Sequence, residues 1–304
     1  EGTNRRLDFH PPKAIPGGPY TGTVGNAVSF SGSANDAGSD ASSYAWDMDN
    51  DGEYDDATGP TPGHTWGSTG SYTVGLKVTD EQGGVGTATT TVDISLATAT
   101  VTLENLNQTY DGSPKPVTVT TNPAGLSYSL TYNGAATVPT NANSYAVVVT
   151  INEPGYTGGN SGTLVIAKAT SVTTVTGGSF TYDGAAHAAA VTVRGAGGLS
   201  LSPAPVYAGT CSAAPVSVAE GTSCTASYSY VGDPNHEASS DSEAIVISKK
   251  TASVTPDAAG KEYGGSEPGL TGTLSGFVGS DGISAVYSRT AGETVAGSPY
   301  TISA

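Results

Sequence analysis

The feature that most constrains the fold is a strand signature that recurs along the chain. The tetrapeptide Thr-Tyr-Asp-Gly at 109–112 returns at 181–184, 72 residues later, and a shorter copy, Glu-Tyr-Gly, stands at 262–264. Apolar closing segments at 92–94, 164–169 and 245–250 repeat at the same intervals of 72 and 81 residues. A period of this size indicates repeated small domains, and it predicts four units with boundaries near residues 97, 169 and 250.

Alternation within these units predicts β-strands. In the clearest one, at 72–79, the residues Tyr72, Val74, Leu76 and Val78 point to one face, and the polar or small residues between them point to the other. Val28 and Phe30 alternate in the same way, Tyr44 shares a strand face with Trp46, and a further strand is expected at 90–94. A core tryptophan and a tyrosine that enters a late strand are typical of an immunoglobulin-like sandwich.

Composition supports an all-β fold. The 304 residues include 42 Gly and 18 Pro, which suits short strands joined by tight turns and argues against long helices. Alternating Val, Thr and Tyr argue against disorder. We therefore predict four tandem immunoglobulin-like β-sandwich domains, the last one incomplete. The expected segments are a linker at 1–13, sandwiches at 14–97, 98–169 and 170–250, and a truncated sandwich at 251–304.

The fourth unit is short compared with the second. Twenty-four residues separate Tyr145 from Ala169, but only four follow Tyr300. A sandwich without its last strands has an unpaired edge. Two explanations stay open: the natural chain continues beyond Ala304, which we favour, or a strand from a neighbouring subunit completes the fold.

An acidic turn between Tyr44 and Asp56 is the main candidate site. Its residues 47, 49, 51 and 52 match positions 1, 3, 5 and 6 of a calcium loop, whereas position 12 is Thr58 and not the usual glutamate. Clustered carboxylates repel one another unless a cation lies among them. We predict calcium binding, with a solvated acidic hairpin as the alternative. The candidate ligands are Asp47, Asp49, Asp51, Glu53, Asp55 and Asp56. Asp36 and Asp40 are secondary candidates.

Cys211 and Cys224 are the only cysteines. They lie in the third unit, which is about ten residues longer than its neighbours, so we predict a disulfide that closes an enlarged hairpin. Two free thiols are the alternative. A disulfide of this loop length stabilises by roughly 3 kcal/mol in the loop-entropy model, and it implies an oxidising compartment outside the cytoplasm.

Charge and motifs exclude several functions. With 27 acidic and 11 basic residues the net charge is −16, so the chain has no cationic footprint for nucleic acid or anionic lipid. No apolar run approaches a membrane-spanning length. His10, His64, His187 and His236 are scattered, and we expect surface or turn positions for them. No nucleophile elbow or phosphate-binding loop is present, so we predict no enzymatic activity.

Two family resemblances follow from the motifs. Segments at 17–20, 44–47, 70–74 and 78–80 make the first unit resemble a PKD domain, with the acidic turn in place of the usual Trp-Asp-Phe-Gly-Asp-Gly. Segments at 110–112, 139–145 and 164–169 make the later units similar to MBG-type bacterial immunoglobulin-like repeats. The last unit shares this pattern at 263–264, 268–272 and 296–300.

These resemblances imply a bacterial extracellular protein, secreted or at the cell surface, without catalytic residues to transfer. We expect a structural stalk or filament segment that is stiffened by calcium and has neighbouring domains or subunits as partners. An adhesin for glycan or protein and the accessory region of a secreted hydrolase are alternatives. Tyr72, Tyr145, Tyr228 and Tyr300 are candidate tyrosine corners.

Overall fold

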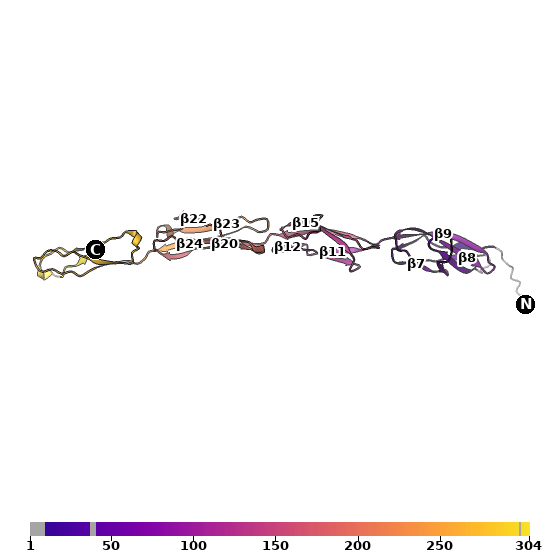
Figure 1. Ribbon diagram of the computed structural model, residues 1–304, viewed down its shortest axis with the longest axis horizontal. Coiled ribbons are helices and arrows are strands. Elements are labelled where there is room, and N and C mark those ends of the chain that lie inside the picture. The colour runs from indigo at the N-terminus through magenta and orange to yellow at the C-terminus, as the bar shows by residue number, and fades with distance from the viewer. Residues whose placement is uncertain (1–9, 37–40, 298) are drawn as a thin grey trace. The chain divides into compact units, whose positions relative to one another are not determined.

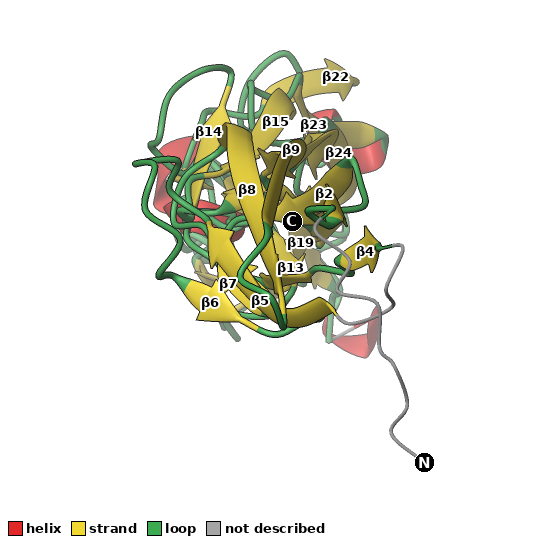
Figure 2. Ribbon diagram, turned by 90° about the vertical axis from the view of Figure 1, so that its right-hand side faces the viewer, coloured by secondary structure: helices red, strands yellow, loops and turns green. Residues whose placement is uncertain are grey.

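The computed structural model describes residues 10–36, 41–297 and 299–304. Most of the expected linker at 1–13, together with Asp40 and Ser298, lies outside the described residues. Strands and loops make up almost all of the described chain (Figure 2). Its helical turns are short 3-10 segments: Ala196–Gly198, Glu220–Thr222, Gly279–Asp281 and Val295–Gly297. The all-β prediction is confirmed.

The first sandwich contains nine strands. A five-stranded sheet of order β2-β9-β8-β5-β6 is accompanied by the pairs β1–β4 and β3–β7. Their bounds are β1 (Lys13–Ile15), β2 (Tyr20–Thr23), β3 (Ala27–Ser29), β4 (Ser33–Asn35), β5 (Ala41–Asp47), β6 (Ala57–Thr58), β7 (Gly63–Thr65), β8 (Gly70–Asp80) and β9 (Val85–Ser95). Lys13, which we assigned to the linker, already pairs with Asn35 in β1.

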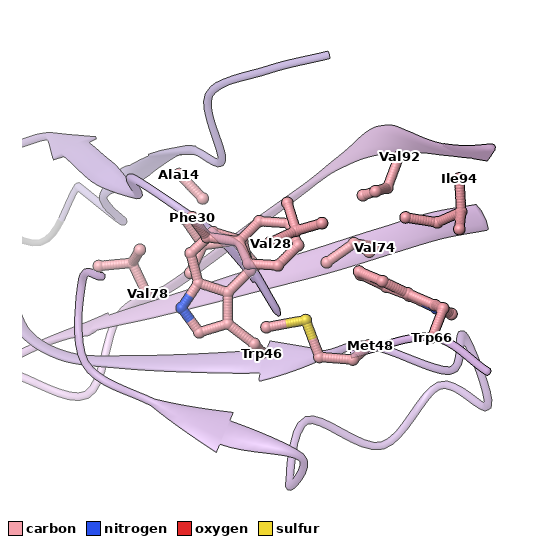
Figure 3. Close-up of a cluster of buried hydrophobic side chains, with 11 residues drawn as sticks. Ala14, Val28, Phe30, Trp46, Met48, Trp66, Val74, Val78, Val92 and Ile94 are labelled. Atoms are coloured by element: carbon pink, nitrogen blue, oxygen red, sulfur yellow. The ribbon is translucent and has the colours of Figure 1, made fainter. Parts of the chain in front are cut away.

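The core of this sandwich lies between these strand groups (Figure 3). Val74, Leu76 and Val78 of β8 are fully buried, as the alternation predicts. Trp46 from β5 is also fully buried and its ring lies 5.2 Å from that of Phe30. Burying large apolar side chains of this kind contributes about 1.5–3 kcal/mol each, so the two layers are held together mainly by this cluster.

The second and third sandwiches share the strand order of their four-stranded sheet and differ in the strands of the other layer. The second pairs β11 with β13 and has a sheet of order β12-β17-β15-β14, and the third has β18-β20-β21 and β19-β24-β23-β22. The second comprises β10 (Ala97–Thr98), β11 (Thr100–Glu104), β12 (Asn107–Thr109), β13 (Thr118–Asn122), β14 (Tyr128–Tyr132), β15 (Asn143–Ile151), β16 (Tyr156–Thr157) and β17 (Gly159–Ala167). The third comprises β18 (Ser171–Thr176), β19 (Gly178–Thr181), β20 (Ala190–Gly195), β21 (Ser200–Leu201), β22 (Val206–Gly209), β23 (Cys224–Tyr230) and β24 (Ser239–Ser248), several of them labelled in Figure 1.

The last segment contains two strand pairs, β25–β26 and β27–β28. Their bounds are β25 (Ser253–Pro256), β26 (Gly272–Ser275), β27 (Ser288–Arg289) and β28 (Ile302–Ser303). Contacts between residues divide the chain into two compact units. The first contains the chain up to residue 108 together with 115–139 and 144–165. The second contains 109–114, 140–143 and 166–304. The domain boundaries expected near residues 97, 169 and 250 therefore stay predictions.

Strand pairing incorporates the residues that we expected to be connections. Ala97 and Thr98 pair in parallel with Tyr156 and Thr157, so β10 crosses the boundary expected at residue 97. Ala169 forms a similar parallel bridge with His236. Few residues between the sandwiches are consequently left without backbone partners.

Candidate metal centre

The acidic turn is held at both ends by β-pairing and by the core. β5 ends at Asp47, the chain reverses, and β6 returns to pair with Ala45 and Trp46. The indole Nε1 of Trp46 donates to the carbonyl oxygen of Gly59 at 2.8 Å, and Met48, inside the turn, is fully buried. The ends of the turn are therefore positioned by burial.

Three carboxylates of the turn converge. Asp47, Asp49 and Asp56 each offer an oxygen atom, and these atoms all lie within 4.8 Å of one another. Asp47 is only 4% exposed, whereas Asp49 and Asp56 face solvent. Negative charges this close repel, and a cation among them removes the repulsion.

Backbone amides orient two of these carboxylates. Asp47 accepts hydrogen bonds from the amide nitrogens of Asn50 and Gly52, at 2.6 and 3.0 Å. Asp56 accepts one from the Met48 nitrogen at 2.6 Å. These bonds pre-form the turn, and each carboxylate keeps lone pairs that a hard cation can use. Calcium prefers six to eight oxygen ligands, so three carboxylates fit a site that carbonyl groups and water complete.

The structure does not bring the other three predicted ligands into this group. Asn50 and Gly52 have positive φ values of 61° and 93°, and the chain reverses between them. Asp51 lies at this reversal and accepts the Glu53 amide at 2.7 Å, a local turn contact. Asp55, like Glu53, is exposed. The structure therefore groups three of the six predicted ligands, and the assignment of calcium ligands stays a prediction.

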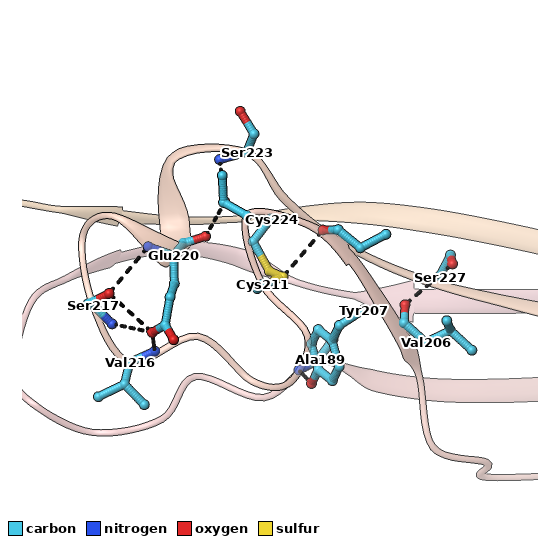
Figure 4. Close-up of a disulfide and its surroundings, with 12 residues drawn as sticks. Ala189, Val206, Tyr207, Cys211, Val216, Ser217, Glu220, Ser223, Cys224 and Ser227 are labelled. Carbon is cyan, nitrogen blue, oxygen red and sulfur yellow. Dashed lines mark hydrogen bonds between the residues drawn. A yellow bond between two sulfur atoms is a disulfide. The ribbon is translucent and has the colours of Figure 1, made fainter.

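The structure joins Cys211 and Cys224 in a disulfide with a Cα–Cα distance of 5.2 Å (Figure 4). Both cysteines are buried in the core of the third sandwich. The bond closes the long connection between β22 and β23, as predicted. Within that connection Glu220 accepts from the amides of Val216 and Ser217, at 2.8 and 2.9 Å, and these bonds lower the pKa of its carboxyl group.

Tyrosine hydroxyls connect strands to neighbouring loops. Tyr72 donates to the Ser68 carbonyl at 2.9 Å, which confirms a tyrosine corner in the first sandwich. The Tyr300 hydroxyl similarly donates to the Thr294 carbonyl at 2.9 Å. Sequence reasoning missed a repeated pair: Tyr132 accepts the Val117 amide at 3.1 Å, and Tyr207 accepts the Ala189 amide at 3.0 Å. The equivalent placement of these two tyrosines in successive units was the available signal.

Of the two positions expected for the histidines, surface or turn, His236 has the turn position only. This residue does lie in a turn, but only 4% of it is exposed, because its ring is enclosed by Asp233, Ala196 and Tyr110. His187 has a partner of the same kind, since its Nε2 lies 3.1 Å from the Asp183 carboxylate and its ring stacks on Phe180.

Successive β-sandwiches with tyrosine corners and a core tryptophan define a tandem array of immunoglobulin-like modules. Family models identify three of these modules. A PKD domain model matches residues 9–95. An MBG domain model matches residues 99–170, and the YGX type of MBG domain matches residues 252–304. The chain thus contains a PKD domain followed by two MBG domains, in the order that the motifs predicted. The third sandwich lies between the two MBG matches, and the strand order of its four-stranded sheet corresponds to that of the second.

No curated protein matches the chain. Solved structures similar to it include fibronectin(III)-like modules of Clostridium thermocellum CbhA, with 14% identity, TM-score 0.25, and coverage of 51% of this chain and 94% of that one. Extracellular cadherin domains 3–6 of protocadherin gamma B2 show 12% identity, TM-score 0.29, and coverage of 85% and 77%. Carbohydrate-binding modules of the β-sandwich superfamily show 18% identity, TM-score 0.26, and coverage of 62% and 79%. We draw nothing further from similarities at these TM-scores. No helix in the described residues is long and apolar enough to cross a membrane.

Proposed function

We propose that this chain is a non-catalytic structural segment, a stalk or filament piece of a bacterial extracellular or surface protein. The observation that carries the proposal is the pairing of the connecting residues. The Ala97 nitrogen donates to the Gly155 carbonyl, and the Ala169 nitrogen to the Asn235 carbonyl, both at 2.9 Å. Backbone hydrogen bonds of this kind contribute roughly 0.5–1.5 kcal/mol each and oppose free rotation of the connecting residues, which supports a stiff segment. The disulfide fits an oxidising, extracytoplasmic location.

Calcium binding by the first domain is part of this proposal. Asp47, Asp49 and Asp56 supply the carboxylates, and the ion would relieve their repulsion and stiffen the turn between β5 and β6. The position-12 glutamate of a calcium sensor is missing, which favours a structural ion of moderate affinity.

The test is the distribution of distances between spin labels attached at two exposed positions in successive sandwiches, Ser129 and Ser242. A narrow distribution in the full chain supports a stiff segment. A distribution as broad as that of a flexible linker of the same length would exclude the stalk role.

An adhesin is a second candidate function, and one cavity favours it. A cavity of about 270 Å³ in the last domain is lined by Tyr263 and Tyr300 together with the charged groups of Lys261, Glu267 and Arg289. Aromatic faces with polar groups beside them suit a saccharide ring. A glycan array probed with calcium present tests this function, and an array without signal counts against it.

A further inference from the structure

The turn between β23 and β24 in the third sandwich contains a buried histidine with two hydrogen-bond acceptors. The Nδ1 atom of His236 lies 2.9 Å from each carboxylate oxygen of Asp233, and its Nε2 atom lies 2.9 Å from the carbonyl oxygen of Ala196. A carboxylate and a carbonyl can only accept hydrogen bonds. Both acceptors are satisfied together only when both ring nitrogens donate, and only the doubly protonated imidazolium has two N–H groups.

Segments that belong in sequence to the second repeat contact the same turn. The edge of the His236 ring meets the Tyr110 ring, with 5.3 Å between their centroids. The Ala142 nitrogen donates to the Asn235 side-chain oxygen at 2.8 Å, and the Asn235 side-chain nitrogen donates to Asn141 at 3.2 Å. The connecting residue Ala169 exchanges backbone hydrogen bonds with the turn, from its nitrogen to Asn235 and from the Glu237 nitrogen to its oxygen.

The charged and titratable groups near His236 come from each element packed around it. Asp233 accepts the Tyr230 hydroxyl at 2.8 Å as well as the imidazole, and Lys168 donates to the Asp233 carbonyl at 2.7 Å. Tyr110 contacts the ring directly, and Asp111, Arg194 and Glu237 are the charged residues next in sequence to Tyr110, Gly195 and His236. Burial opposes ionisation of Asp233, but hydrogen bonds from His236, Tyr230 and backbone amides outweigh it and lower its pKa to about 2. Asp233 is therefore ionised throughout the neutral pH range.

The second repeat has an equivalent turn without a histidine. Its residues Glu153, Pro154, Gly155 and Tyr156 correspond to Asp233, Pro234, Asn235 and His236. The backbone contact is the same, since Ala97 donates to Gly155 as Ala169 donates to Asn235. A group that changes charge between about pH 5 and 8 has thus been placed in only one of these two described turns.

We propose that His236 is a pH-dependent lock that holds the segments at 109–112 and 140–143 on the turn of the third sandwich. In the imidazolium form both acceptors are satisfied. When the pH rises, the ring keeps the Nδ1 proton that the Asp233 carboxylate holds and loses the Nε2 proton, so a nitrogen lone pair faces the Ala196 carbonyl oxygen, and two acceptors in contact repel. The turn then loosens, and with it the hydrogen bonds of Asn235 to Ala142 and Ala169.

The experiment uses the full chain and two NMR measurements between about pH 5 and 9. Long-range ¹H–¹⁵N spectra of the His236 ring report its protonation directly. Amide exchange at Ala142, corrected for the intrinsic pH dependence of exchange, reports whether the Ala142 nitrogen stays hydrogen-bonded to Asn235. We expect both ring nitrogens to be protonated at the low end, and protection of Ala142 to fall about tenfold as the ring deprotonates. A ring that stays neutral at every pH, or protection that does not follow its titration, overturns the proposal.

Asp233→Asn separates the lock from a purely structural role. The introduced amide can donate to the neutral ring, so the contact persists while its pH dependence disappears. The matched control is Asp183→Asn, which changes the other His–Asp pair at His187 and should leave the Ala142 profile unaltered. A pH profile of Ala142 that is the same in Asp233→Asn as in the parent chain would also overturn the proposal.

Discussion

The indole nitrogen of Trp46 donates a hydrogen bond to the carbonyl oxygen of Gly59, 2.8 Å away. This single bond connects the fully buried centre of the first core to the strand that returns from the acidic turn. Packing of the PKD core and the position of the carboxylates are therefore coupled through one side chain.

Trp46→Phe tests this coupling. The substitution keeps an aromatic ring in the core but leaves the Gly59 carbonyl without its donor, so we expect a loss of about 2–4 kcal/mol from the smaller ring and the lost bond. The unfolding transition of the first domain in chemical denaturant measures this loss of stability. The disulfide-containing third domain serves as the internal control, and an unchanged first transition contradicts the coupling.

Calcium should stabilise the first domain selectively. At a calcium concentration of about 100 times Kd the gain is about 2.7 kcal/mol, and a chelator removes it. Calorimetric melting of the full chain with calcium and with chelator measures the difference. Asp56→Asn should abolish it, whereas Asp55→Asn, at the adjacent position outside the convergent group, should keep it. Equal effects of the two variants would contradict the assignment of ligands.

Removal of the disulfide should destabilise the third domain. We expect the double variant Cys211→Ala and Cys224→Ala to lose roughly 3 kcal/mol, since the opened loop gains conformational entropy in the unfolded state. Denaturation monitored at Tyr207, which lies in the same core, measures the loss. The PKD transition should not move, and a loss shared equally by all domains would argue against a local effect.

The position of the Tyr110 ring should depend on the absence of a side chain at Gly197. A Cβ atom at Gly197 would lie 2.5 Å from the Tyr110 hydroxyl oxygen, and Gly197 has a φ of 61°. Gly197→Ala should displace the Tyr110 ring, which NMR contacts between this ring and His236 detect. Gly198→Ala is the control, because φ is 87° there and no atom lies within 4 Å of the added Cβ. It carries the backbone strain without the clash, so the ring contact should survive.

The ion pairs of the last domain predict a loss of order in acid. Hydrogen bonds from Arg289 and then Lys261 lower the pKa of Glu267 to about 2. A carboxyl whose pKa is lower in the folded state stabilises that state above its unfolded pKa of about 4.3, and the contribution disappears as pH falls toward 2. Amide exchange in β27, measured from neutral pH down to about pH 2, should therefore become faster relative to its intrinsic rate as Glu267 is protonated.

Glu267→Gln should flatten the acid part of that profile. Glu262→Gln, an exposed carboxyl on the same segment for which no such ion pair is seen among the described contacts, is the control. If both variants keep the parent profile, the ion pairs do not stabilise β27.

Much of the fold could be predicted because the alternation of apolar and polar residues along a strand is visible within a short stretch of sequence. Val74, Leu76 and Val78 follow the two-residue period of a strand, and the structure buries all three. The repeated tetrapeptides likewise predicted the repeated units, and the cysteine pair predicted the disulfide, from short stretches of sequence. The candidate site was predicted only as a segment: six carboxylates were adjacent in sequence, but local backbone conformation at Asn50 and Gly52 selected which of them meet.

The sequence by itself determined the all-β class, the succession of PKD and MBG domains, the core role of Trp46 and the Cys211–Cys224 bond. Only the tertiary structure decided that Asp47, Asp49 and Asp56 converge, that Tyr132 and Tyr207 serve the same purpose in two repeats, and that His236 is buried against Ala196. The physical reason is that strand periodicity acts over neighbouring residues, whereas these contacts join groups up to 40 positions apart, and chain folding alone brings their atoms within hydrogen-bonding distance.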